Sequence, residues 1–281
     1  MDQLRVATLN LWNKSGPWIK RMARIRAELG AEDFDIVGLQ EVLELENDSG
    51  TKNQAGEIAE GRHWCFGLGH NMKGKWVPKG SRLGFGNAVL SRFPIASSEV
   101  VPLPGADQSD QKRSLLHACV QAPFGDLDVF VTHLNWRLDE GHIREQQVCA
   151  VVDAIEARAR AGYPALLMGD FNADPQANEI RYLRGLCTLG RPRSVRFADA
   201  WEYAPDAGLG FTFDGRANQY ASTYHEPPRR LDYLFVRGGP DAQGRGYPDR
   251  VRLAFHEPVD GVWCSDHFGV AADLRVGPVR S

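Results

Sequence analysis

Leu166-Leu167-Met168-Gly169-Asp170-Phe171-Asn172 is the stretch that decides how this chain is interpreted. The apolar run from Ala165 to Met168 follows a turn and is typical of a strand buried on both faces. The glycine lets the backbone bend, so Asp170 and Asn172, two apart in an extended chain, project to the same side. An ordinary turn is the alternative, since Asp174-Pro175 suits a helix start. The stretch therefore predicts a strand ending in an acid and an amide.

Other short polar motifs follow or interrupt apolar runs along the chain. They are Thr8-Leu9-Asn10, Leu39-Gln40-Glu41, Thr132-His133-Leu134, Arg230-Leu231-Asp232-Tyr233 and Ser265-Asp266-His267. Each motif is worthless alone, but six in one order make a strong signal. In that order, and with Gly86-Asn87 opening a Gly-Asn-x-x-Leu-Ser-Arg-x-Pro-Ile segment, the chain resembles the endonuclease/exonuclease/phosphatase superfamily of DNase I-like, metal-dependent phosphoesterases. The resemblance covers essentially the whole chain.

Length and composition indicate an ordinary globular protein. The 281 residues contain no Pro/Gly/Ser-rich linker or charge block, so residues 1–281 are expected to form one domain. A net charge of −3 gives no global attraction to nucleic acid or to an anionic membrane, although a local basic groove stays open. No run is apolar and long enough to cross a bilayer.

The cysteines and the start of the chain bear on its compartment. Five scattered cysteines, an odd number without a Cys-x-x-Cys pair, argue for reduced thiols and against a disulfide framework or a zinc site. A strand pattern begins almost at once and leaves no room for a signal segment. A cytoplasmic protein is the expectation.

The order of predicted elements is strand-rich and irregular. Strands are expected at residues 4–12, 35–40, 64–72, 85–95, 113–120, 127–134, 165–168, 231–236 and 270–276. Helices are expected after Pro17, ending at Gly30, and after a cap at Asp139, while residues 43–61 are interpreted as a helix or loop. The apolar residues at helical spacing, on the expected inward faces, are Ile19, Met22, Ile25 and Leu29 in the first helix and Ile143, Val148, Val151, Val152 and Ile155 in the second. The superfamily resemblance implies an α/β (α+β) four-layer sandwich, in which two mixed or antiparallel sheets pack face to face between helices.

The acidic and amide residues suggest a hard metal ion. Oxygen ligands without cysteine favour Mg²⁺, or Mn²⁺ as an alternative. By resemblance, Glu41 is the principal metal carboxylate and Asn10 lies beside it. Asp266 is a second ligand or an outer partner.

The remaining motifs suggest catalytic groups. Asp232 lies between apolar neighbours, where an unpaired charge is costly, so it needs a partner, and His267 is the candidate. By resemblance, Asp170 orients and deprotonates water, and Asn172 and His133 contact the phosphate. His267 is then a general base or, if protonated, a clamp on developing charge.

Three residues are candidate substrate contacts. Arg113 matches a family arginine that reaches the scissile phosphate, although a sheet-edge charge is the alternative. Arg216 and Asn218 lie in an aromatic and amide-rich loop that either sets specificity or is an irregular surface loop. A lysine-rich loop at residues 73–80 is either a solvated hairpin tip or a contact for a phosphate or an aromatic ligand.

These features predict a Mg²⁺-dependent hydrolase acting on phosphoesters, more often diesters than monoesters. Acidic residues outnumber basic ones by 36 to 33, which favours a small or lipid-derived substrate. A nuclease acting on DNA or RNA is the alternative substrate class. A catalytically inactive module that binds phosphate ligands is the alternative from another class.

Overall fold

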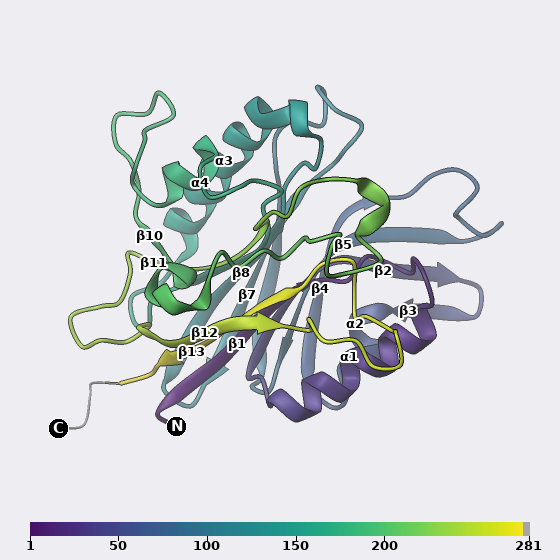
Figure 1. Ribbon diagram of the computed structural model, residues 1–281, viewed down its shortest axis with the longest axis horizontal. Helices are drawn as coiled ribbons and strands as arrows, with labels where there is room; N and C mark the ends of the chain where they lie inside the picture. The colour runs from purple at the N-terminus through teal and green to yellow at the C-terminus, as the bar shows by residue number, and fades with distance from the viewer. Residues whose placement is uncertain (278–281) are drawn as a thin grey trace.

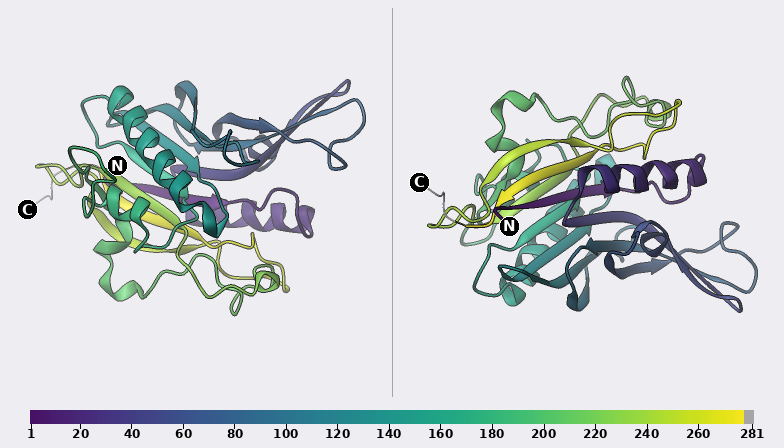
Figure 2. Two further views of the ribbon diagram at one scale, coloured as in Figure 1. Left: turned by 90° about the horizontal axis from the view of Figure 1, so that it is seen from above. Right: turned by 90° about the horizontal axis from the view of Figure 1, so that it is seen from below.

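The computed structural model describes residues 1–277 and shows two β-sheets that face each other, with helices outside them (Figure 1). The N-terminus and residue 277, the last described residue, lie at one side of the molecule in the two views of Figure 2, and the β4–β5 hairpin projects toward the opposite side. The sequence-based expectation of a four-layer sandwich is confirmed.

The first sheet has the strand order β12-β13-β1-β2-β5-β4, and β3 pairs with the far end of β2. Its strands are β1 (Gln3–Asn10), β2 (Ile36–Asn47), β3 (Gly50–Asn53), β4 (His63–Asn71), β5 (Arg82–Ser91), β12 (Pro248–Ala254) and β13 (Gly269–Arg275). β1 and β2 run parallel, whereas the other pairs are antiparallel. The carboxyl ends of β1 and β2 therefore meet at one edge of this sheet.

The second sheet has the strand order β10-β11-β9-β8-β7-β6. Its strands are β6 (Ile95–Pro102), β7 (Ser114–Ala122), β8 (Gly125–His133), β9 (Leu166–Asp170), β10 (Phe197–Asp199) and β11 (Asp232–Arg237). Only β8 and β9 run parallel among the described pairs of this sheet. Each sheet thus has one parallel pair whose strand ends carry motif residues.

Helices cover the outer face of each sheet. The α-helices are α1 (Trp18–Glu32), α2 (Gln54–Ile58), α3 (Gly141–Arg158) and α4 (Asn178–Leu183), and the 3₁₀ turns are η1 (Leu138–Glu140), η2 (Ala200–Tyr203), η3 (Pro205–Ala207) and η4 (Ser222–Tyr224). One apolar cluster lies between the sheets, a second joins the first sheet to α1 and α2, and a third joins the second sheet to α3 and α4. Burial of these three apolar layers is the main driving force for the fold. No helix among residues 1–277 is long and apolar enough to cross a membrane.

The first helix differs from its prediction at its end and on its apolar face. It continues through Gly30 to Glu32, and the left-handed capping position is taken by Asp33, with φ of 53°. A glycine inside a helix is tolerated at a modest cost, so it did not end this one. Ile19, expected on the inward face, is 70 % exposed, and the buried face instead includes Arg21.

Two other expectations need correction. Residues 43–61 are not one helix or loop, because β2 continues past Glu41 to Asn47 and is followed by β3 and α2. Asp139 does not cap α3; it lies in η1, and the helix begins after Glu140 without a side-chain cap. The predicted apolar stripe of α3 is confirmed, with its Ile and Val side chains buried.

Candidate active site

Strand register brings the sequence motifs to one end of the two sheets. In the first sheet, Asn10 pairs with Gln40, immediately before Glu41. In the second, Asp170 pairs with His133 on one side and with Asp232 on the other. Because β1 contacts β9 and β11 across the sandwich, the two groups meet.

A cleft of about 310 Å³ opens at this end of the molecule. The predicted residues that line it are Asn10, Glu41, His133, Asp170, Asn172, Asp266 and His267. All of these except the half-buried Glu41 are buried, although the backbone around them belongs to two sheets and several loops. Such a convergence of acids, amides and imidazoles in one cleft defines a candidate active site.

Asp170 lies at the centre of the cleft. Gly169 before it has φ of 145°, and a Cβ there would lie 1.9 Å from the carbonyl oxygen of Thr132, so the close strand approach requires glycine. The amide of Asn10 donates to Oδ2 of Asp170 at 2.9 Å, and the backbone N–H of Asn172 donates to Oδ1 at 2.9 Å. Burial and the nearby Asp232 raise the pKa of Asp170 to about 6. The carboxylate is thus held in place with the basicity expected of a general base.

Glu41 lies on the opposite wall in an unusual backbone conformation. Its φ is 57°, and the pairing of β2 with β5 shifts register between Leu39 and Val42. A non-glycine residue at positive φ within a bulge re-aims a side chain at a cost in strain. The side chain receives a hydrogen bond of 2.9 Å from the amide of Asn13. This bulge turns a carboxylate of a sheet strand toward the cleft.

His267 is held between two carboxylates. Its Nδ1 lies 2.8 Å from Oδ2 of Asp232, and its Nε2 lies 3.8 Å from Oδ2 of Asp170. Burial opposes its charge, but Asp232 and Asp170 outweigh burial and raise the pKa of His267 well above its ordinary value. The two carboxylates therefore favour the protonated form of His267, and its predicted pairing with Asp232 is confirmed.

His133 has the opposite character. Burial and the neighbouring Arg113 lower the pKa of His133 well below its ordinary value, so the imidazole is neutral. Nη1 of Arg113 lies 3.0 Å from Nδ1 of His133, and a guanidinium only donates, so the ring proton sits on Nε2. Nε2 lies 3.5 Å from Oδ2 of Asp170. His133 is thus a neutral donor facing the same carboxylate.

The cleft has the donor set of a hard cation. Asp266 and Glu41 both line it, and burial together with the charge of Glu41 raises the pKa of Asp266 to about 7. Two carboxylates that disfavour each other's charge are stabilised by a cation between them. The ligand atoms of Asp170, Asp232 and His267 also lie within 4.8 Å of one another. That group could also hold a metal ion, and its Asp232 and His267 are joined by the contact of 2.8 Å described above.

The three predicted substrate contacts lie outside the cleft lining. Arg113 is buried behind His133, and Gln111 accepts a bond of 2.7 Å from it. Arg216 pairs with Asp214 at 3.1 Å and points to solvent, whereas the buried Asn218 donates to the backbone carbonyl of residue 265 at 2.8 Å. In this structure Arg113 contacts His133, and Asn218 holds the loop that carries Asp266. The substrate contacts of these three residues stay predictions.

Sequence reasoning missed Asn13 and Arg21. Asn13 follows the strand that ends in Asn10, and this polar residue after a motif was a usable signal. The sequence carried no signal for Arg21, because its partners are backbone carbonyls, including those of Leu11 and Cys264. A buried arginine on the inner face of an amphipathic helix contradicts the usual pattern.

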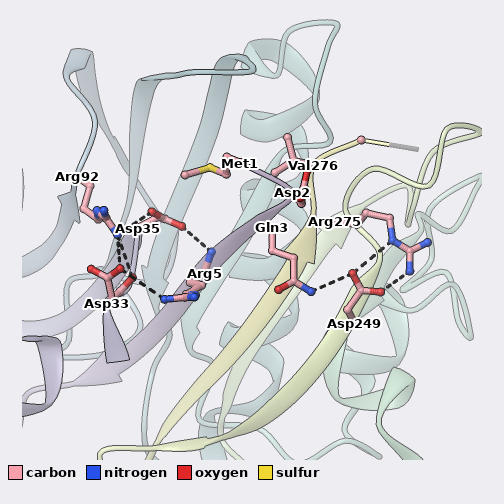
Figure 3. Close-up of a pocket in the computed structure, with 11 residues that line it drawn as sticks. Met1, Asp2, Gln3, Arg5, Asp33, Asp35, Arg92, Asp249, Arg275 and Val276 are labelled. Carbon is pink, nitrogen blue, oxygen red and sulfur yellow. Dashed lines mark hydrogen bonds and ion pairs between the residues drawn. The ribbon is translucent and has the colours of Figure 1, made fainter. Parts of the chain in front are cut away.

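A larger cavity, of about 890 Å³, lies at the other end of the molecule beside Met1 and Val276 (Figure 3). Its charges are already paired: Arg92 lies 2.8 Å from Asp33, and Arg275 pairs with Asp249. It contains none of the motif residues. Size alone therefore does not mark the functional site.

Two facing mixed sheets with a buried Asp/Asp/His group at one end form a DNase I-like phosphoesterase fold. The chain belongs to the endonuclease/exonuclease/phosphatase family, whose model matches residues 7–267. No curated protein matches the sequence.

Solved structures show the same fold. The structure of D. rerio TDP2 complexed with single-strand DNA product has a TM-score of 0.73 and 20% identity, covering 97% of this chain and 99% of that chain. An endonuclease/exonuclease/phosphatase from Beutenbergia cavernae DSM 12333 has a TM-score of 0.72 and 29% identity, covering 99% of this chain and 72% of that chain. A family protein from Leptotrichia buccalis C-1013-b has a TM-score of 0.70 and 19% identity, covering 97% of this chain and 99% of that chain.

Proposed function

We propose that this protein is a Mg²⁺-dependent phosphodiesterase, with Mn²⁺ as an alternative ion. The observation that carries the proposal is the asymmetric cleft: a fixed carboxylate of raised pKa, Asp170, faces two carboxylates suited to a cation, Glu41 and Asp266. An acid–base group opposite a cation site is what hydrolysis of a phosphoester by water requires.

The side chains of the cleft suit the parts of that reaction. Asp170 accepts the proton of the attacking water, because its raised pKa is close to neutral pH. Nε2–H of His133 and the amide of Asn172 donate to phosphoryl oxygens. The imidazolium of His267 stabilises charge that develops on the phosphoryl group, and Asp232 keeps it protonated. Glu41 and Asp266 would hold the divalent cation, which supplies Lewis-acid neutralisation of the phosphoryl oxygens.

The proposed test is hydrolysis of bis-p-nitrophenyl phosphate with Mg²⁺, with Mn²⁺ and with EDTA. We expect turnover that EDTA abolishes and that Asp170→Asn lowers by about 10²- to 10⁴-fold, the range for a general base. Asp126→Asn is the matched control, because Asp126 is an exposed aspartate on β8 that pairs with Arg160. Absence of metal-dependent turnover on a panel of phosphoesters would instead favour the inactive phosphate-binding module.

A nuclease is the second candidate, and one observation favours it: D. rerio TDP2, with the same fold, was solved with a single-strand DNA product. Against it, the chain has a small acidic excess and one short lysine-rich loop. We therefore expect weak binding of duplex DNA at physiological salt and a substrate that is small or lipid-derived. Plasmid nicking that Asp170→Asn abolishes, with DNA affinity that falls steeply with salt, would reverse this preference.

A further inference from the structure

A second cavity of about 450 Å³, here called the side pocket, adjoins the cleft. Its walls are largely apolar and include Leu43, Leu45, Met72, Trp76 and Leu83. Leu45 and Leu83 are directly paired across β2 and β5, so their side chains share one face of the sheet. Trp76, in the lysine-rich loop, is 70 % exposed. A large exposed aromatic at the mouth of an apolar pocket marks a binding surface.

The side pocket is continuous with the active-site cleft. Asn13 and Ser15 line both cavities. Asn13 is also the residue that donates to Glu41, and Leu43 lies two residues beyond Glu41 on the same strand. A ligand bound through its phosphate near Glu41 can therefore extend into the side pocket.

The wall between the two cavities is fixed by hydrogen bonds. The buried Gln54 accepts from the backbone N–H of Leu43 at 2.7 Å and donates to the carbonyl of Asn13 at 2.9 Å. Through these two hydrogen bonds, Gln54 holds the loop after β1 in a fixed position beside β2. This wall of the pocket is thus formed before a ligand arrives, which lowers the entropic cost of binding.

Asn13 and Ser15, the uncharged polar residues that line the pocket, are already hydrogen-bonded to each other. Oδ1 of Asn13 accepts from the backbone N–H of Ser15 at 3.0 Å and from its hydroxyl at 2.8 Å, while its Nδ2 donates to Glu41. The edge of a nucleobase would have to leave water for a wall mostly made of Leu, Met, Pro and Trp side chains. An alkyl chain or a plain aryl ring has no such cost.

Lysines around the pocket complement an anionic ligand. Lys14 lines it, and Lys73, Lys75 and Lys79 flank Trp76 in the loop. Nζ of Lys75 lies 5.4 Å from the centre of the Trp76 ring. An apolar group joined to a phosphate matches this surface, because apolar side chains line the pocket together with Lys14 and because Lys75 lies beside Trp76.

We propose that the side pocket binds the apolar alcohol part, alkyl or aryl, of the substrate phosphodiester. This deepens the proposed function and rests on it. The pocket thereby determines specificity, and Leu45 and Trp76 are its determining residues. The lysine-rich loop, for which a solvated hairpin tip was the alternative, is then part of the substrate site.

The first experiment compares kcat/KM for methyl, hexyl and phenyl p-nitrophenyl phosphates. We expect the hexyl ester to exceed the methyl ester by at least about tenfold, which burial of two added methylenes suffices to give. Trp76→Ala and Leu45→Asn should each reduce that ratio toward one. Leu186→Ala, at a remote leucine that is 55 % exposed, should leave it as in wild type. The phenyl ester separates an aryl from an alkyl preference.

The outcomes distinguish the pocket from the reaction. If turnover depends on the metal but kcat/KM is the same for all three esters, the side-pocket assignment is overturned and the proposed phosphodiesterase activity still stands. A Trp76→Ala effect confined to thymidine 5′-p-nitrophenyl phosphate assigns the pocket to a nucleobase and also overturns it.

A binding experiment covers the case in which no ester is hydrolysed. Hexyl phosphate and methyl phosphate are titrated calorimetrically against the folded protein with Mg²⁺. Tighter binding of hexyl phosphate that Leu45→Asn removes supports the pocket even if the phosphodiesterase proposal fails. Equal affinities for the two ligands overturn the pocket.

Discussion

Nδ1 of His267 lies 2.8 Å from Oδ2 of Asp232, and both side chains are buried at the edge of the cleft. The other oxygen of Asp232 has no hydrogen-bond partner among the described residues. The aspartate therefore interacts with the site mainly through His267, and the pair forms one functional unit.

If the pair is one unit, its two members should not lose activity independently. Asp232→Asn and His267→Ala are each expected to lower kcat/KM by about 10²- to 10⁴-fold. The double variant should be little worse than the more damaging single variant, because each change already disables the imidazolium. Steady-state kinetics of the cycle, with circular dichroism as a control for folding, checks this. Losses that multiply would assign the two residues separate roles.

Glu41 is expected to act through the metal. Glu41→Gln keeps the shape of the side chain and its hydrogen bond from Asn13 but removes the charge that a hard cation needs. The Mg²⁺ concentration for half-maximal activity and the calorimetric affinity for Mg²⁺ should both worsen by about 10- to 100-fold. Glu44→Gln is the matched control, since Glu44 lies on the same strand and binds Asn53. Unchanged Mg²⁺ dependence in Glu41→Gln would exclude Glu41 as the ligand.

The sequence predicted most of the cleft because several motif residues lie at strand ends: Asn10, His133 and Asp170 each end a buried strand. Parallel neighbours such as β1 and β2 bring their carboxyl ends to one edge, so Asn10 and Glu41 were expected together. The partner of Asp232 could be inferred because a buried charge needs compensation, and His267 lies opposite it. The chemistry of each motif was therefore sufficient to predict that these residues lie together.

Other features depend on tertiary contacts that leave no sequence pattern. The bulge at Glu41 arises from a register shift between two strands, so the strand was expected to end where it continues. The amide of Asn218 donates to a backbone carbonyl 47 residues away in sequence, a contact that its own segment does not reveal. The side pocket joins β2, β5 and the lysine-rich loop, and no single segment reveals it.

Asp128 predicts how stability changes in acid. It accepts from the ring of His117 at 2.8 Å and from the guanidinium of Arg160 at 2.8 Å. Burial opposes its charge, but these two partners prevail and hold the pKa of Asp128 well below its ordinary value. A carboxylate whose pKa is lower in the folded than in the unfolded protein stabilises the fold at pH values above its unfolded-state pKa, which is about 4. This stabilisation is lost as the pH falls through the folded-state pKa.

Asp128→Asn should therefore lower the free energy of unfolding at pH 7 by about 1 to 3 kcal/mol. The difference in free energy of unfolding between variant and wild type should stay constant down to about pH 4 and then become smaller in stronger acid. Urea unfolding from pH 7 to pH 2 measures it. The exposed neighbour Asp126, changed to Asn, should cost less than about 0.5 kcal/mol. A gap that does not narrow in acid would show that packing, not charge, stabilises this site.

Arg21 joins the two loops that carry the cleft residues. The side chain is fully buried, and Nη1 donates to the carbonyls of Leu11 at 2.7 Å and Cys264 at 2.9 Å. Further bonds run from Nε to Ser15 and from Nη2 to the carbonyls of Trp12 and Asn13. Burial lowers the pKa of Arg21 only to about 10, so it stays charged near neutral pH.

Arg21→Lys should therefore impair the site while the charge is retained. An ammonium offers three donors from one atom and cannot span carbonyls that a guanidinium reaches from three nitrogens. The loop carrying Asp266 would lose its link to the loop after β1, so the Mg²⁺ concentration for half-maximal activity should rise by about tenfold or more. Arg24→Lys is the control: Arg24 lies one turn further along α1 and bonds Glu28 at 3.2 Å, away from the cleft. Thermal unfolding will report a lower Tm for Arg21→Lys, and the assay is run well below that temperature. If Arg21→Lys lowers Tm without changing the Mg²⁺ requirement, Arg21 stabilises the fold but does not position the metal carboxylates.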